Sequence, residues 1–133
     1  MGRVETDGGF WLVLGLMVLL LPARFLAGVI LAAAVHEAGH LLAIRCTGSR
    51  VLRLELHSGG ARIVTDPMEP GREILCALAG PAAGALAVAV WRVFPELALA
   101  GLGQTVFNLL PLGELDGGRA LDAVMLMLRR KPG

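Results

Sequence analysis

Long apolar runs separated by short polar segments are the main feature of this sequence. Residues 1–9 are polar and glycine-containing, so we expect a short disordered tail. Phe10 to Leu21 is apolar without interruption, and Phe25 to Ile44 is a second apolar segment. A membrane-crossing helix needs about 20 apolar residues, so the second segment is long enough, whereas the first needs tilt or its preceding glycines to span. Both are predicted to be membrane helices, and full spanning by the first is left open.

Two further apolar segments follow a polar stretch. Glu73 to Phe94 is predicted to be a third helix, and the small residues of Gly80 to Gly84 in its middle favour close helix packing. A fourth segment runs from Leu97 to Leu110, is interrupted at Pro111-Leu112-Gly113, and resumes from Arg119 to Leu128. Because this stretch is too long for one straight span, we expect a broken helix whose unwound part lines a polar cavity.

Between the second and third apolar segments the pattern changes to alternation. Val51 to Leu56 alternates apolar and charged residues, Ser58-Gly59-Gly60 is a turn signal, and Ala61 to Val64 alternates again. A period of two residues is typical of a strand, so this region is predicted to be a β-hairpin.

The composition supports a membrane protein. Hydrophobic residues make up 56% of the 133 residues and charged residues only 17%, and the mean hydropathy is +0.71. This length predicts a single domain, residues 1–133. The net charge of +1 argues against a nucleic-acid partner. Cys46 and Cys76 are expected to be free thiols in a reducing compartment.

The placement of basic residues predicts the topology. Basic residues flank the hairpin and close the chain, whereas the opposite loops hold only Arg24 and Arg92. By the positive-inside rule, both termini and the hairpin are cytoplasmic. The predicted fold is a multi-pass, all-α bundle of about four transmembrane segments in the cell membrane, with a small cytoplasmic β-hairpin and a broken last helix. The basic residues on the cytoplasmic side are Arg45, Arg50, Arg53, Arg62, Arg72, Arg129, Arg130 and Lys131.

The sequence His36-Glu37-Ala38-Gly39-His40 lies inside the second apolar segment. Positions 36 and 40 are one helical turn apart, so both imidazoles project from one face and can hold one zinc ion at about 2.0–2.1 Å. Glu37 points about 60–100° away from them and can reach an attacking water without being a ligand. Charged residues in an apolar helix cost about 2.5–3.5 kcal/mol each, which calls for a functional reason. We interpret this motif as a catalytic zinc site.

A catalytic zinc site needs a third protein ligand, for which the sequence offers five candidates. His57 lies at the hairpin turn, where we expect an exposed loop residue, and Asp122 lies beside the polar face of the final amphipathic stretch. Asp116 follows the helix break and precedes two glycines, where the backbone can bend to bring its carboxylate to the metal. Glu73 and Glu114 are the remaining candidates.

The segment from Asn108 to Gly117, N-L-L-P-L-G-E-L-D-G, resembles the N-x-x-P-x-x-x-x-D-G motif of the site-2 proteases. These intramembrane zinc metalloproteases also carry H-E-x-x-H. Gly59-Gly60 in the hairpin and Gly80-Pro81 in the next helix match as well. The resemblance covers residues 25 to about 125 and is greatest to the stage IV sporulation protein FB branch, which activates a sporulation sigma factor. Gly113 departs from the pattern, because the family often has a second proline there.

By this resemblance, His36, His40 and Asp116 are zinc ligands, Glu37 is the catalytic base, and Asn108 binds substrate or braces the broken helix. The implied activity is zinc-dependent cleavage of a membrane-associated protein near the cytoplasmic face, such as a sigma-factor precursor. The hairpin edge could pair with an extended substrate segment, and a plain connecting hairpin is an equal alternative. A membrane inhibitor or regulator, and a homo-oligomer, are left open.

Three other functions agree less well with the sequence. A catalytically idle relative that binds membrane segments is disfavoured, because all four catalytic positions are present. A metal transporter or sensor would need further His, Asp or Glu along a pathway, and the other spans offer almost none. The apolar spans exclude a soluble zinc protease.

Overall fold

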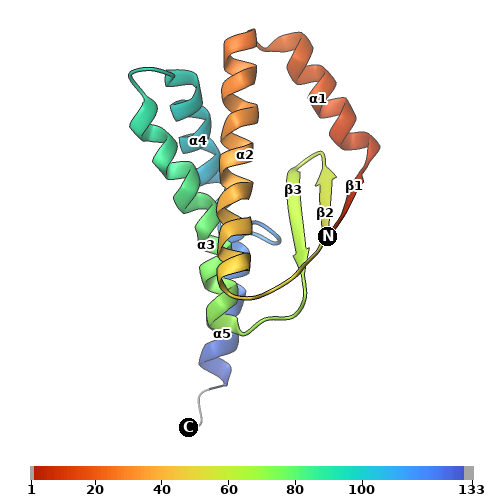
Figure 1. The fold of residues 1–133 in the computed structure, drawn as a ribbon, viewed down its shortest axis with the longest axis vertical. Helices are drawn as coiled ribbons and strands as arrows, with labels where there is room; N and C mark the ends of the chain where they lie inside the picture. The colour runs from red at the N-terminus through yellow and green to blue at the C-terminus, as the bar shows by residue number, and fades with distance from the viewer. Residues whose placement is uncertain (1, 131–133) are drawn as a thin grey trace.

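The computed structural model describes residues 2–130, which form helices around one central helix and a small sheet (Figure 1). Figure 1 shows α2 in the middle, with α3 and α4 on one side of it and α1 and the sheet on the other. In chain order the elements are β1 (Arg3–Thr6), α1 (Gly8–Leu20), α2 (Ala23–Cys46), β2 (Val51–His57), β3 (Gly60–Thr65), α3 (Pro70–Leu86), the 3₁₀ turn η1 (Ala87–Val90), α4 (Pro95–Asn108) and α5 (Asp116–Arg129).

Within residues 2–130, two helical segments are long and apolar enough to cross a membrane. They are Ala23–Cys46 and Pro70–Val90. α1 is also apolar but shorter, and none of its residues is buried within the chain. Its exposed side chains include Trp11 and Leu19, of which Leu19 is 81% exposed. A helix that is apolar all round and unburied in its own fold has the surface that a lipid environment requires.

Small residues bring the backbones of α2, α3 and α4 into contact. A Cβ added at Gly28 would lie 2.9 Å from the backbone nitrogen of Leu97 at the start of α4. A Cβ added at Gly39 would lie 2.5 Å from the carbonyl oxygen of Ala79 in α3. Between helices in lipid, where the hydrophobic drive is absent, such close approach supplies the packing energy.

The third helix differs from the predicted span of Glu73 to Phe94. It begins at Pro70, because proline at the first helical position already has a helical φ and lacks only an N–H that would be unpaired there. It continues through Pro81 and ends at Leu86, where four residues of 3₁₀ helix follow. The apolar pattern runs on through η1, so hydrophobicity alone did not mark this end.

The fourth apolar stretch forms two helices, α4 and α5, joined by residues 109–115. α5 begins at Asp116, three residues earlier than predicted, and lies along α3. The joining segment contains Gly113 with a φ of +47°, a left-handed conformation that a proline could not adopt. Glycine therefore fits the turn that this chain makes where related motifs have proline.

The predicted hairpin is confirmed, but it belongs to a three-stranded sheet of order β1-β2-β3. β1 pairs in parallel with β2, from Arg3 opposite Arg53 to Thr6 opposite Leu56, so the expectation of a disordered tail is wrong for these residues. Asp7 then caps α1 by accepting a bond of 2.7 Å from the Phe10 N–H. The first polar residues thus form an edge strand and a helix cap.

Candidate metal centre

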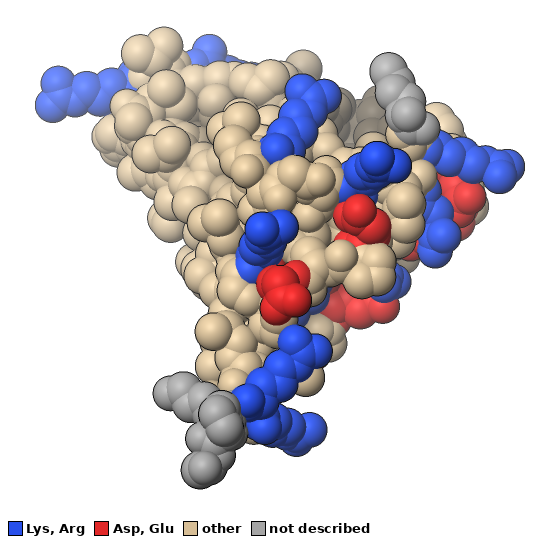
Figure 2. Space-filling view, turned by 60° about the horizontal axis from the view of Figure 1, so that its bottom comes forward, with Lys and Arg blue, Asp and Glu red and all other residues tan. Residues whose placement is uncertain are grey.

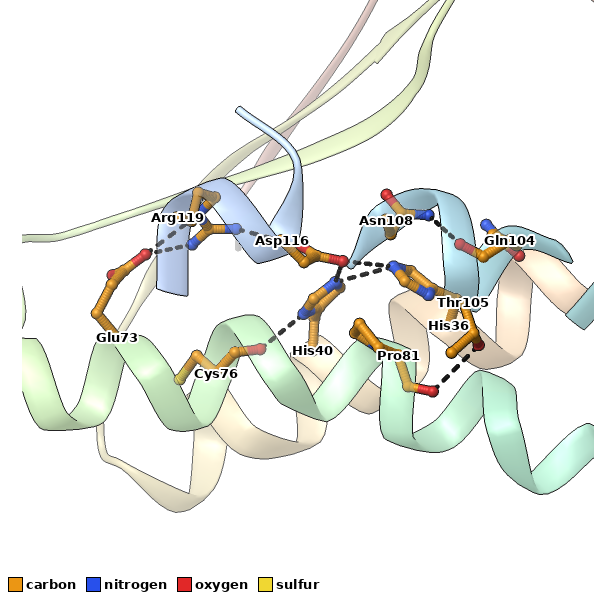
Figure 3. Close-up of polar contacts among 10 residues, drawn as sticks. All are labelled: His36, His40, Glu73, Cys76, Pro81, Gln104, Thr105, Asn108, Asp116 and Arg119. Atoms are coloured by element: carbon orange, nitrogen blue, oxygen red, sulfur yellow. Dashed lines mark hydrogen bonds and ion pairs between the residues drawn. The ribbon is translucent and has the colours of Figure 1, made fainter. Parts of the chain in front are cut away.

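Three buried side chains from two helices converge on one point (Figure 3). His36 and His40 lie one turn apart on α2, and Asp116 lies in the first turn of α5. Their exposed fractions are 2%, 6% and 5%. Asp116 Oδ2 lies 3.0 Å from His36 Nε2 and 3.2 Å from His40 Nε2, and the two Nε2 atoms are 3.1 Å apart. These three atoms form a nearly equilateral triangle.

This triangle has the dimensions of three corners of a tetrahedral zinc site. Bonds of about 2.0–2.1 Å at tetrahedral angles place neighbouring ligand atoms about 3.3 Å apart. A carbonyl oxygen can only accept, so the 2.7 Å bond between His40 Nδ1 and the carbonyl of Cys76 puts the proton on Nδ1. In the neutral ring, Nε2 of His40 then points a lone pair at the carboxylate, an arrangement that a cation stabilises. The residues present therefore fit a zinc ion.

The backbone of α3 makes room for His40 at Gly80. An added Cβ there would lie 2.5 Å from His40 Cε1 and 2.7 Å from Cδ2, and would overlap Nε2. The absence of a side chain lets the Nε2 end of the imidazole lie against the helix backbone. The sequence indicates a structural role for Gly80 and its neighbours, and the structure adds this contact with a candidate ligand.

Glu37 lies on the wall of the same cavity without joining the triangle. The cavity has a volume of about 140 Å³, and its wall includes His36, Glu37, His40 and Asp116. Glu37 is half-buried, whereas both flanking histidines are buried. A carboxylate in this position can take a proton from a small molecule in the cavity while the three buried atoms hold a metal.

The hairpin and the segment between α4 and α5 form the rim of the cavity. Arg62 of β3 donates a 2.8 Å ion-pair bond to Glu114, which joins the two parts of the rim. His57 is half-buried on this rim rather than exposed, and its Nδ1 accepts from the Gly59 N–H. Neither His57 nor Glu114 belongs to the group of three.

The remaining predicted residues have distinct positions. Asn108 is half-buried at the end of α4, lines the cavity, and donates from Nδ2 to the Gln104 carbonyl at 2.9 Å. Asp122 is exposed on α5. Glu73 is bound to Arg119 and does not reach the triangle. Among residues 2–130, the group that could hold a metal ion is His36, His40 and Asp116.

Two polar contacts around the site were not predicted from the sequence. Arg119 of α5 donates from Nε and Nη2 to Glu73 Oε1 of α3, at 3.1 Å and 2.6 Å. Thr105 of α4 donates to the Pro81 carbonyl of α3 at 3.2 Å. The sequence carried one sign of the first contact: Arg119 lies three positions after Asp116, and residues three apart share a helix face.

The comparisons with known proteins bear on the fold. No protein-family model matches the chain, and no curated protein matches it. Among solved structures, the site-2 protease from Methanocaldococcus jannaschii superposes with a TM-score of 0.76 and 23% sequence identity, over 96% of this chain and 69% of that one. The chain has a site-2 protease fold. This likeness of fold agrees with the resemblance that the two sequence motifs indicate.

Proposed function

We propose that this protein is an intramembrane zinc endopeptidase. The observation that carries the proposal is the triangle of His36 Nε2, His40 Nε2 and Asp116 Oδ2, buried among apolar helices, with Glu37 on the adjoining cavity wall. Three protein ligands beside an open cavity are typical of catalytic rather than structural zinc sites. The similarity to a site-2 protease structure supports the same conclusion.

Each side chain of the site has a separate proposed role in peptide hydrolysis. Zinc, when bound, supplies Lewis acidity that polarises a carbonyl and makes water more acidic. His36, His40 and Asp116 hold it, and the bond of His40 to the Cys76 carbonyl fixes the ring orientation. Glu37 accepts the proton of the attacking water and passes it to the leaving amine. Asn108 at the end of α4 binds the substrate backbone or braces the segment before Asp116.

We propose that the sheet binds the substrate at the edge of β3. β2 is paired on both sides, so β3 keeps an outer edge unpaired within residues 2–130. Ala61, Arg62 and Ile63 of β3 also line the cavity. An extended peptide added to this edge would bring its backbone beside Glu37, because strand addition uses main-chain hydrogen bonds. A helical substrate must unwind first, since its peptide bonds are shielded in the helix, so a cut near its end is easier.

We further propose that the chain is a multi-pass protein of the cell membrane with about four spans, with the broken α4–α5 region as its last span and with both termini and the sheet in the cytoplasm. Figure 2 brings the bottom of Figure 1 forward and shows basic side chains spread over this end with acidic ones between them. Basic residues are more numerous near the hairpin than in the opposite loops, which supports a cytoplasmic position for this end. Lys131, the last basic residue of the sequence, lies outside the described residues. His40 lies within about two turns of the cytoplasmic end of α2, so the cut is placed near that surface.

The proposed substrate is a membrane-associated protein, and a sporulation sigma-factor precursor is the proposed example. The choice of a sigma-factor precursor rests on the sequence resemblance to the stage IV sporulation branch. A membrane-bound regulator and a homo-oligomer are compatible with the exposed apolar helices, of which α1 is the clearest.

The test is cleavage by purified protein of a candidate substrate with a membrane segment, with and without a zinc chelator. The expected result is a released fragment that chelation abolishes and added zinc restores. The matched control is Glu37→Gln, which keeps the side-chain shape and cannot accept the proton. Cleavage that survives chelation, or that Glu37→Gln performs at the normal rate, would contradict the proposal.

A further inference from the structure

The two oxygens of Asp116 have different partners. Oδ2 faces both imidazoles, at 3.0 Å and 3.2 Å. Oδ1 has Arg119 Nη1 at 3.9 Å, one turn along the same helix. Asp116 is 5% exposed, so water has little access to the carboxylate. The carboxylate thus has one oxygen beside the two imidazoles and the other in an ion pair with Arg119.

Arg119 is itself fixed by Glu73 from the neighbouring helix. Nε and Nη2 both donate to Glu73 Oε1, at 3.1 Å and 2.6 Å. The two side chains are 29% and 27% exposed, so the pair is partly shielded from solvent. Two charge-assisted bonds to a planar guanidinium restrict its rotation as well as its position. The third nitrogen, Nη1, is left pointing along α5 toward Asp116 (Figure 3).

Glu73 lies one turn before Cys76 on α3, and this turn contacts both helices that carry candidate ligands. The Cys76 carbonyl accepts from His40 of α2 at 2.7 Å, and the Glu73 carboxylate accepts from Arg119 of α5. Neither residue contributes a metal-binding atom. One turn of α3 therefore contacts a histidine of α2 directly and reaches the aspartate of α5 through Arg119.

We propose that Arg119, held by Glu73, is a positioning residue that fixes Asp116 with Oδ2 toward the two histidines. This inference rests on the proposed zinc site and adds the cause of its third ligand's orientation. The alternative role of the pair is to dock α5 on α3 with no effect on the carboxylate. The two roles differ in one respect: positioning requires a positive charge at residue 119, whereas docking requires only opposite charges at 73 and 119.

Exchange of the two charges separates these roles. In the double variant Glu73→Arg with Arg119→Glu, an ion pair between α3 and α5 can form again, but a carboxylate replaces the guanidinium beside Asp116 Oδ1. Positioning predicts that the exchange restores thermal stability and leaves zinc binding impaired. Docking predicts that both recover.

The experiment measures zinc affinity of the purified full chain by competition with a chromophoric chelator, and the visible absorption of the cobalt-substituted protein. Arg119→Gln and Glu73→Gln are expected to weaken zinc binding about 10–100-fold and to alter the cobalt spectrum, since this is the usual effect of losing an outer-shell partner. Arg119→Lys keeps the charge and should recover part of the affinity. The control is Arg24→Gln, which removes another Arg–Glu pair between helices, 2.9 Å long, at a site apart from Asp116. It should bind zinc normally.

Each outcome decides between the roles. Weakened zinc binding in the single variants and in the charge exchange, with a normal control, supports positioning. Normal zinc affinity and cobalt spectrum in folded Arg119→Gln, or full recovery of affinity in the charge exchange, overturns it and leaves the proposed protease intact. If Arg119→Gln does not fold, Glu73→Gln and Arg119→Lys carry the same comparison. A wild-type chain that binds no zinc overturns the proposed function as well, so the two failures are distinguishable.

Discussion

Gly80 of α3 lies directly against the ring of His40, so alanine at this position tests the proposed metal centre without altering a candidate ligand. The added Cβ would lie 2.5 Å from His40 Cε1 and 2.7 Å from Cδ2. Carbon atoms in contact prefer about 3.5–4.0 Å, so the ring would have to move by about 1 Å. The ring cannot turn freely, because Nδ1 is bound to the Cys76 carbonyl at 2.7 Å. Nor can α3 withdraw without losing its contact with Gly39 of α2.

A displacement of about 1 Å is several times the tolerance of about 0.2 Å on a metal–ligand distance. We therefore expect Gly80→Ala to remove His40 from the site. Zinc affinity should fall by at least about 100-fold, because a lost ligand costs more than the about 10–100-fold of a lost outer-shell partner. A factor of about 100 corresponds to about 2.8 kcal/mol of binding free energy.

The assay is zinc content per chain together with chelator competition on the purified protein. Gly103→Ala is the matched control, because it makes the same change in α4 with no heavy atom within 4 Å of the new Cβ. Alanine favours a helix over glycine by about 1 kcal/mol, so this variant should bind zinc normally and be at least as stable. A folded Gly80→Ala chain with the affinity of the control would refute the assignment of His40 in this orientation.

Four further outcomes are expected. Glu37→Gln should keep its zinc and lose proteolysis, since the residue lies on the cavity wall and outside the triangle; activity near normal would remove it as the base. Asp116→Ala should bind zinc more weakly while His57→Ala binds it normally, and the reverse pattern in metal analysis would make His57 the third ligand. With Cys46 and Cys76 replaced, a cysteine at the exposed Ser58 should resist an impermeant reagent added outside intact cells, and labelling there would overturn the cytoplasmic placement of the sheet. Mass spectrometry of the released fragment should map the cut near the cytoplasmic end of the substrate's membrane segment, and a terminus on the external side would refute the depth argument.

Features set by local sequence were the ones predicted well. The spacing of His36 and His40 fixes their common face once a helix forms, and the structure places both Nε2 atoms 3.1 Å apart. The alternation after Ser49 and the Ser58-Gly59-Gly60 turn gave the hairpin with boundaries within a residue or two. Asp116 was favoured by its glycine neighbours and by the motif resemblance, and it lies within 3.2 Å of both histidines.

Features that depend on distant partners, and that no sequence motif marks, were not predicted. β1 is polar and short, and its pairing with β2 joins residues some fifty positions apart, so nothing local distinguished it from a disordered tail. Glu73 and Arg119 are separated by 46 positions, and their contact exists only because α5 packs on α3. Gly80 could be identified as a packing residue, but its contact with His40 requires the register between two helices.

The glycine contacts of α2 determine from which direction a protein chain can approach Glu37. At Gly28 and Gly39, α2 meets the backbones of α4 and α3 with no room for even a methyl group, so a peptide cannot pass through those seams without pulling helices apart. The rim of the cavity is instead bounded by the ion pair of Arg62 and Glu114, whose side chains are 47% and 70% exposed. Surface pairs of this kind are worth only about 0–1 kcal/mol. For the proposed substrate, entry past the sheet therefore disturbs the fewest contacts, and an incoming strand would meet the unpaired edge of β3 there.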